Sequence, residues 1–320
     1  KHLRLLERVM NLLEGVALSR LCDYSFVEES AQWGNIFSPF MKPKLIGLQN
    51  HEFQNKCREV KKQRDYMTLF VDNIRLYKRE LYDLNDDDKQ TFEHLMQQGT
   101  VLDLCSKLNM NFIIFTNLED VPIDDKIHDL IPKNVLAISA INAVSYGGKV
   151  YPAPYGLQRQ MHPGDNRKQI IEEILSHEDI EPTNLLYINH STYTNPKERL
   201  GINEIFEGKD WALVNKERVG YDEFLSHIRD HKFMVCPIGN ALDCHRNWEV
   251  LYLRRVPVMR KHPYLEELYK NYPVLFVDRY EDVTEELLIQ NNHLYEWAKT
   301  LDFTELSLPY FYDNFVKQHA

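Results

Sequence analysis

Short apolar runs alternate along the chain with segments in which apolar residues recur every three or four positions. In the first half the runs are YMTLFVDN at 66–73, NFIIFTN at 111–117 and NVLAISAI at 134–141. Runs of this length are typical of strands buried on both faces of a parallel sheet, and the helical patterns between them are typical of crossover helices. The first half of the chain therefore predicts an α/β layer.

The second half shows another series of the same kind. Strands are expected at 184–190, 211–215, 232–237, 256–259 and 274–278, with helices between them. Five strands that alternate with helices predict a Rossmann-like domain. The remaining C-terminal residues are helical in pattern and rich in aromatic side chains.

The densest cluster of helix and strand breakers lies at 151–168, which holds three prolines and two glycines. Such clusters mark turns and linkers, so we place a domain boundary there. A chain of 320 residues is long enough for two domains, because single cores stop growing at about 250–300 residues. The expected organisation is one domain over 1–155 and a second domain over 156–320.

The composition is that of a globular protein and argues against two classes of partner. Hydrophobic residues make up 43% of the chain, which is typical of a folded protein rather than a disordered one. The net charge of −10 argues against nucleic-acid binding, which needs a broad basic face. No apolar run approaches the roughly 20 residues of a membrane span, so no span is expected.

The five cysteines are odd in number, widely spaced and without a CxxC pair. This pattern is typical of reduced thiols rather than of a disulfide framework or a zinc site, and it favours a cytoplasmic location. The first residue is lysine rather than methionine. We therefore expect the chain to be a domain cut from a longer protein.

Two common nucleotide-binding motifs are missing from the sequence. No predicted strand is followed by GxGxxG, and GxxxxGK[ST] does not occur. Their absence argues against standard dinucleotide-dependent hydride transfer and against P-loop phosphoryl transfer.

One segment, CPIGNALDCHRNWEVLYLRRVPV at 236–258, combines a strand end with two charged residues at the start of a helix. Gly239 lets the backbone approach a ligand closely. Arg246 suits a phosphate, and Glu249, one turn later on nearly the same face, suits the hydroxyls of a ribose. The alternative is that Glu249 only complements the helix dipole and that Arg246 pairs with it on the surface.

The stretch KFMVCPIGNALDCHRNWEVLYLRRVPVM at 232–259 resembles the donor-binding segment of exostosin-like glycosyltransferases. In that family F-x-hydrophobic-C-P-x-G is followed by an arginine, by a glutamate three residues later, and then by V-P-V. The matching residues are Phe233, Cys236, Pro237, Gly239, Arg246, Glu249, Val256, Pro257 and Val258. The chain differs in having Arg254 and Arg255 where the family usually has a small GC or AG pair.

The resemblance implies a GT-B architecture, in which two Rossmann-like lobes flank a cleft and the C-terminal helices cross back. The donor would be held mainly by the C-terminal lobe. The implied activity is the transfer of a sugar from a nucleoside diphosphate sugar, with UDP favoured and GDP possible, to a carbohydrate acceptor. The implied reaction inverts the sugar and requires no metal or other cofactor.

Further residues are expected at the donor site from their places after predicted strands. Thr194 or Asn195 is expected to cap the helix that opens at Pro196, and Arg199 to meet the diphosphate from the early turns of that helix. The alternative is that Asn195 is only a cap and Arg199 only a surface charge.

Three more donor-binding residues are expected. Lys216 follows the strand at 211–215 and is expected to line the base pocket, while Asn240 and His245 belong to the loop and helix start after the strand at 232–237. His190 is a further histidine candidate for the cleft. A lone histidine is, however, more often a structural residue than a functional one.

An inverting transferase needs a general base that removes a proton from the acceptor hydroxyl. GT-B enzymes usually supply it from the acceptor lobe, where Asp72, Glu119 and Asp120 stand at predicted strand ends. Asp72 is the first choice. The alternative for each is a solvated loop carboxylate.

Two rival functions remain. The run Asp86–Asp88 has the DxD pattern of metal-dependent transferases, although it directly precedes KQTFEHLMQQ, where aspartates cap a helix. The other rival is a carbohydrate- or nucleotide-binding module that has kept the fold without the chemistry.

Overall fold

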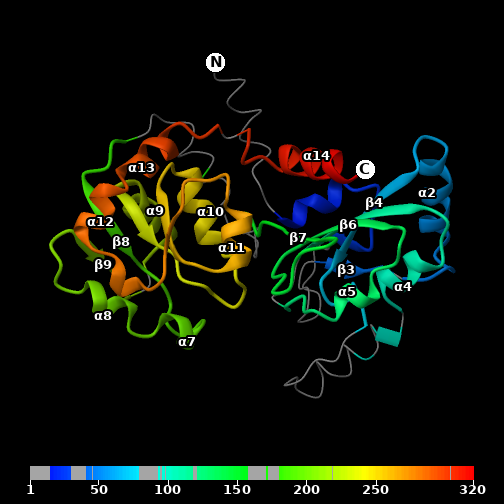
Figure 1. Ribbon diagram of the computed structural model, residues 1–320, viewed down its shortest axis with the longest axis horizontal. Helices are drawn as coiled ribbons and strands as arrows, with labels where there is room; N and C mark the ends of the chain where they lie inside the picture. Colours follow the sequence, from blue (N-terminus) through cyan, green and yellow to red (C-terminus); the bar gives the residue numbers. More distant parts are fainter. Residues whose placement is uncertain are drawn as a thin grey trace. The chain divides into compact units, whose positions relative to one another are not determined.

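The computed structural model describes residues 15–29, 41–44, 46–78, 93, 96–97, 99–117, 121–157, 171, 180–217, 219–302 and 304–320. These residues form two compact units (Figure 1). The first unit holds Gly15–Ala153 together with Phe311–Ala320, and the second unit holds Pro154–Tyr310. Each unit contains a parallel five-stranded sheet, so the α/β class is confirmed, and the two sheets are consistent with two Rossmann-like lobes.

The sheet of the first unit has the strand order β1-β4-β5-β6-β7, and all neighbouring strands are parallel. The strands span Tyr24–Ser25 (β1), Tyr66–Asp72 (β4), Asn111–Asn117 (β5), Val135–Ala140 (β6) and Val150–Pro152 (β7). Their order in the sheet follows their order in the chain. The described strands of this unit therefore contain no point at which the strand order reverses.

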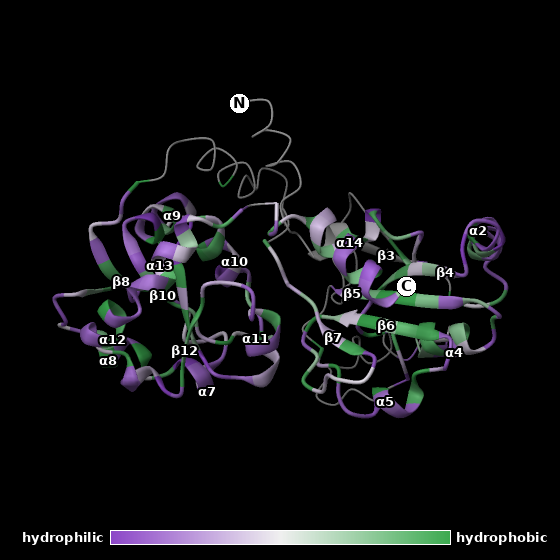
Figure 2. Ribbon diagram, turned by 45° about the horizontal axis from the view of Figure 1, so that its top comes forward, coloured by the Kyte–Doolittle hydropathy of each residue, from purple (hydrophilic) through white to green (hydrophobic). Residues whose placement is uncertain are grey.

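Helices cover both faces of the first sheet. They are η1 (Gly15–Arg20), α2 (His51–Lys61), α4 (Val101–Ser106), α5 (Ile127–Leu130) and α14 (Leu308–His319), and a separate antiparallel pair is formed by β2 (Val27–Glu29) and β3 (Met41–Pro43). On one face, the sulfur atoms of Cys57 on α2 and Met67 on β4 lie 3.7 Å apart. On the opposite face Tyr312 of α14 forms a 2.9 Å hydrogen bond with Thr68 and stacks on Phe115. Strand β4 is mostly hydrophobic and α2 is mostly hydrophilic (Figure 2), as expected for a covered strand and an outer helix.

The sheet of the second unit has the strand order β12-β11-β10-β8-β9, again with parallel neighbours throughout. The strands span Asn184–Ile188 (β8), Ala212–Val214 (β9), His231–Val235 (β10), Val256–Arg260 (β11) and Leu275–Val277 (β12). The chain passes from β8 to β9 on one side and then to β10 on the other side of β8. Ligands of open parallel sheets bind at the carboxyl ends of the strands at such a reversal.

Helices and one 3-10 turn follow the strands of the second unit. They are α7 (Pro196–Arg199), α8 (Ile202–Phe206), α9 (Tyr221–Arg229), α10 (His245–Tyr252), α11 (Pro263–Leu268), η2 (Tyr280–Asp282), α12 (Glu285–Gln290) and α13 (Asn292–Lys299). One face of the sheet packs Leu186, Phe233 and Val256 against Leu288 of α12 and Tyr295 of α13 in a single apolar core. The opposite face is covered by α9 and α10, which bury Leu225, Ile228, Trp248 and Leu251.

The eight strands predicted from apolar runs are confirmed, each to within a few residues. The strands β1, β2, β3 and β7 were missed because none of these short segments belongs to a longer apolar run. The segment PKERLGINEIF at 196–206 predicts a single helix that opens at Pro196. That prediction is wrong, since Gly201 has a φ of 85° and separates α7 from α8. Glycine adopts this left-handed conformation without the steric cost that a side chain would add.

Candidate functional site

A cavity of about 810 Å³ lies in the second unit at the reversal of its strand order. The loops after β8, β9 and β10 and the starts of α9 and α10 form its wall. Seven of the nine predicted donor-binding residues line it: Thr194, Arg199, Lys216, Asn240, His245, Arg246 and Glu249. The volume lies in the range of about 300–1,000 Å³ that is usual for small-molecule sites.

Asp243 holds the loop after β10 and the start of α10 in place. Its side chain is almost fully buried, and its oxygens accept hydrogen bonds from backbone N–H groups and neutral side chains. The donors are Tyr155 N, Cys244 N, Asn247 Nδ2, Trp248 Nε1 and the Tyr269 hydroxyl. Burial raises the pKa of the Asp243 carboxyl, although the hydrogen bonds oppose that shift. The carboxylate sits next to the N-terminus of α10, so the positive end of the helix dipole already faces this anion.

Arg199 is buried and ties two loops of the site together. Its Nη1 donates to Ser191 O after β8 at 3.0 Å. Its Nε and Nη2 donate to Ile238 O and Pro237 O after β10, at 2.9 and 3.2 Å. All three acceptors are uncharged, and no described carboxylate forms an ion pair with Arg199. Burial, and secondly the charge of Arg246, lower the pKa of Arg199.

Arg246 projects from the first turn of α10, and its guanidinium carbon lies 5.9 Å from the centre of the Phe224 ring. Its Nε is buried and has no hydrogen-bond partner among the described residues. None of the described carboxylates forms an ion pair with it, Glu249 included. The alternative of a surface pair between Arg246 and Glu249 is therefore wrong for the part of the chain that the structure describes.

Glu249 is buried, with 5% of its surface exposed. The Tyr221 hydroxyl, at the start of α9, donates to its Oε1 at 2.8 Å. Within the described residues no other hydrogen bond to this carboxylate is present. A buried carboxylate with one oxygen satisfied is costly unless another donor reaches it. Among the described residues, Oε2 of Glu249 is thus left without a donor.

His245 is the first residue of α10, and its Nδ1 lies 2.7 Å from Gly156 O. A carbonyl only accepts hydrogen bonds, so Nδ1 carries the hydrogen. The imidazole is also packed edge-on against Tyr155 at a centroid distance of 5.0 Å. In the neutral ring Nε2 is then an acceptor, and this tautomer is fixed by the protein.

His190 lies near the start of the loop after β8 and is buried. Its Nε2 lies 3.4 Å from Arg199 O, which assigns the hydrogen to Nε2, and its Nδ1 has no hydrogen-bond partner in the described part of the chain. Burial, and secondly the charge of Arg246, lower the pKa of His190 to about 4. The ring is therefore neutral at pH 7.

Asn195 and Gly239 lie outside the lining residues of the cavity, and the predicted side-chain cap by Asn195 is wrong. Asn195 occupies the N-cap position of α7, but its side chain caps no helix N–H and instead donates to Gly239 O at 2.8 Å. At Gly239 an added Cβ would lie 3.0 Å from Cys244 Sγ and 3.1 Å from Arg199 Nη2. The absence of a side chain at Gly239 thus makes room for Arg199 and Cys244.

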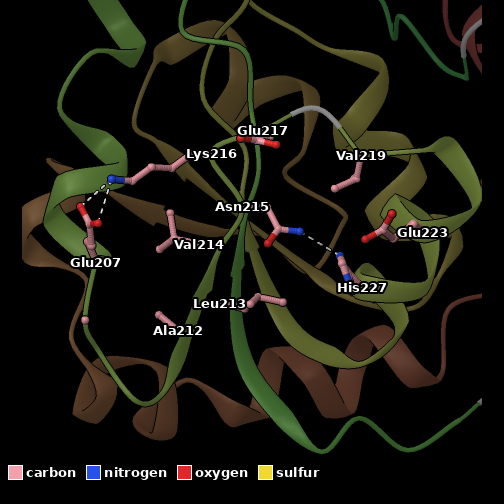
Figure 3. A pocket seen from close by; sticks show the side chains of 11 residues that line it. Glu207, Ala212, Leu213, Val214, Asn215, Lys216, Glu217, Val219, Glu223 and His227 are labelled. Carbon is pink, nitrogen blue, oxygen red and sulfur yellow. Dashed lines mark hydrogen bonds and ion pairs between the residues drawn. The ribbon is translucent and has the colours of Figure 1, made fainter.

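Thr194, Asn240 and Lys216 stand at the exposed rim of the cavity. The Lys216 Nζ lies 2.8 Å from both carboxylate oxygens of Glu207. Figure 3 draws this pair in the wall of a neighbouring cavity. A second cavity of about 720 Å³ adjoins the first and shares Lys216, Glu217 and Val219 with it. Lys216 is the cation of the site that already has a carboxylate partner.

Asp72, the first choice for a general base, lies at the end of β4 in the first unit and is 5% exposed. Arg75 Nε donates to its Oδ2 at 2.6 Å, and Arg75 N donates to its Oδ1 at 2.8 Å. Arg75 also donates to Lys44 O and Phe26 O at 2.8 and 2.9 Å. This closed network favours a structural role for Asp72, because a general base needs an accessible lone pair.

The other acidic candidates lie outside the described residues. They are Glu119, Asp120 and the run Asp86–Asp88. Within the described ranges, no group of three or more histidine, cysteine, aspartate or glutamate side chains is placed to hold a metal ion. The described helices also include none that is both long and apolar enough to cross a membrane.

Three residues of the site were not found from the sequence. Tyr221 and Asp243 bond to partners far along the chain, and Phe224 faces Arg246 from another helix. Only Asp243 left a local signal, since an aspartate just before a helix, with Asn247 and Trp248 in its first turns, is a typical helix-start arrangement. The contact of Tyr221 with Glu249 had no local signal.

Comparison with known proteins adds no relative. No protein-family model matches the chain, and no curated protein matches it at a significant level. The resemblance of residues 232–259 to exostosin-like glycosyltransferases therefore stays a prediction that rests on the sequence motif.

Proposed function

We propose that the second unit binds a nucleoside diphosphate sugar and that the chain is an inverting glycosyltransferase of GT-B architecture. One observation carries the proposal: Arg199 and Arg246 line one cavity at the strand-order reversal, and no described carboxylate pairs with either. The charge of buried Arg199 next to that of half-buried Arg246 raises the energy of the empty site, and a dianionic ligand lowers it.

The proposed roles follow from the positions of the side chains. Arg246, whose buried Nε has no hydrogen-bond partner among the described residues, binds the diphosphate directly. Arg199 supplies a fixed charge behind the loop, since its Nε, Nη1 and Nη2 each donate to a carbonyl. Together they stabilise the negative charge that grows on the leaving diphosphate. Glu249 accepts a hydrogen bond from the ribose.

The resemblance supplies the finer parts of the proposal. They are UDP as the favoured nucleotide with GDP possible, a carbohydrate acceptor, inversion of the sugar, and a reaction without metal. Asp72 is not retained as the preferred base, because its oxygens are engaged by Arg75. Glu119 and Asp120 remain the carboxylates proposed for that role.

A binding module without transfer activity is the second candidate. The engagement of Asp72 with Arg75 favours it, since this leaves the described residues without a free carboxylate among the three proposed bases. Release of UDP from UDP-sugars, with and without added oligosaccharide acceptors, separates the two candidates. A protein that binds UDP but never releases it from any UDP-sugar is the module.

The proposal is tested by thermal unfolding with UDP, GDP, CDP, dTDP and ADP, each with Mg²⁺ and with EDTA. A ligand at 100 times its Kd stabilises by about 2.7 kcal/mol, which is a shift of several degrees for a protein of this size. We expect one nucleotide to stabilise the protein equally in both conditions. Stabilisation that requires Mg²⁺ favours the metal-dependent rival, and no stabilisation by any nucleotide contradicts the proposal.

A further inference from the structure

Glu249 cannot offer both of its oxygens equally to a ribose. Its Oε1 already accepts from the Tyr221 hydroxyl at 2.8 Å, and the side chain is buried in the wall of the cavity. Oε2 is the oxygen without a described partner. The site therefore presents one open carboxylate oxygen in a fixed direction, rather than a freely rotating carboxylate.

The Tyr221 hydroxyl is held by the fold and not by the ligand. Tyr221 is the first residue of α9, and its ring stacks on Phe224 one turn later, with 6.3 Å between centroids. Phe224 in turn lies under the guanidinium of Arg246. One short segment of α9 thus supports both charged residues of α10 that face the cavity.

We propose that Tyr221 is a positioning residue that sets the sugar specificity of the nucleotide: by fixing Glu249 it makes the site select ribonucleoside over deoxyribonucleoside diphosphates. This inference rests on the proposed function, because it needs a nucleotide in the cavity. Loss of one ribose hydroxyl leaves a buried charged acceptor unpaired, and such losses typically cost about 10- to 100-fold in affinity. Without the Tyr221 hydroxyl, Glu249 can turn away and the preference falls.

The test compares the Kd of UDP with those of 2′-deoxy-UDP and 3′-deoxy-UDP by calorimetric titration. For the wild type we expect at least one deoxy form to bind about 10-fold or more weakly than UDP. In Tyr221→Phe and in Glu249→Gln, the ratio of the Kd of that deoxy form to the Kd of UDP falls to about 3 or less. The double variant has the ratio of the single variants, because both changes remove the same interaction.

A matched control is Tyr193→Phe, which removes a hydroxyl from the same cavity on a ring that is 92% exposed. It should keep the wild-type ratio. Circular dichroism of every variant checks that the fold is intact.

The outcomes separate the two proposals. If UDP binds but Tyr221→Phe keeps the wild-type ratio, or if the two changes act additively, the role of Tyr221 is wrong and the nucleotide site stands. A wild type that binds UDP and both deoxy forms equally also overturns the role of Tyr221. Failure of UDP and of the other nucleoside diphosphates to bind contradicts the proposed function and this inference together.

Discussion

The two units build the same kind of parallel sheet, but they treat buried charge at the strand ends in opposite ways. In the first unit the strands follow chain order, and the buried Asp72 is paired with the buried Arg75. In the second unit the strand order reverses between β8 and β10, and the buried Asp243 is surrounded by uncharged donors. The two arginines that line its cavity, Arg199 and Arg246, have no described carboxylate partner.

This difference indicates at which strand ends an anionic ligand is expected. A buried arginine costs free energy unless an anion accompanies it. In the first unit Asp72 is that anion, and it pairs with Arg75 at the end of β4. In the second unit the buried carboxylate of Asp243 accepts hydrogen bonds from uncharged groups instead. The charge of Arg199 and Arg246 is then left for an anion from solution, at the place where parallel sheets bind ligands.

The largest expected effect comes from breaking the closed pair of the first unit. Asp72→Asn leaves Arg75 buried without a counter-charge and should lower the free energy of unfolding by about 3–5 kcal/mol. Urea unfolding followed by far-UV circular dichroism measures this. A loss of transfer activity with stability unchanged would instead restore Asp72 as a general base.

The next effect concerns the carboxylate of the second unit. In Asp243→Asn the amide nitrogen faces hydrogen-bond donors such as Cys244 N or Trp248 Nε1. We expect a loss of about 3 kcal/mol, the value of one or two hydrogen bonds to a charged group. Tryptophan fluorescence during urea unfolding reports on this unit through Trp248. A loss below about 1 kcal/mol would show that Asp243 is not the support of the loop.

Arg246→Met should separate binding from stability. Nucleoside diphosphate affinity should fall about 10- to 100-fold, while the free energy of unfolding without ligand stays the same or rises, because the repulsion of Arg199 is relieved. Titration calorimetry and urea unfolding measure the two quantities. The matched control is Arg260→Met, which removes a partly exposed ion pair with Glu198 and should leave affinity unchanged.

A smaller effect is the pH dependence that His190 contributes. Its pKa is about 4 in the folded protein and about 6.5 in the unfolded chain. The folded state thus binds fewer protons than the unfolded state as the pH falls. The contribution of His190 to the free energy of unfolding is therefore complete above pH 6.5 and declines as the pH falls toward 4. The decline is on the order of 2 kcal/mol. His190→Gln should show a shallower fall in stability between pH 7 and pH 4.5, and equal slopes would refute the contribution.

The sequence predicted the parts of the fold that are coded locally. The apolar runs located β4, β5, β6 and β8–β12, because buried parallel strands are continuous apolar segments. The spacing of Arg246 and Glu249 likewise located two residues of one cavity, since side chains three positions apart on a helix share a face.

The remaining features depend on contacts between distant residues. Tyr221 lies 28 positions from Glu249, and Tyr155 lies 88 positions from Asp243. Neither pairing follows from spacing on one helix or strand. The same limit applies to Asp72. From the sequence its carboxylate is predicted to be a free group at a strand end, whereas in the structure it is bonded to Arg75, which is itself held by Phe26 O and Lys44 O.

The measurement that tests the central claim most directly compares the affinity of UDP with that of uridine, by titration calorimetry in EDTA. The two ligands differ only in the diphosphate that Arg199 and Arg246 are proposed to neutralise. The account predicts that UDP binds about 100-fold or more tightly than uridine, as expected for charge-assisted hydrogen bonds in a partly buried site. Equal affinity for UDP and uridine, or no binding of UDP, would contradict it.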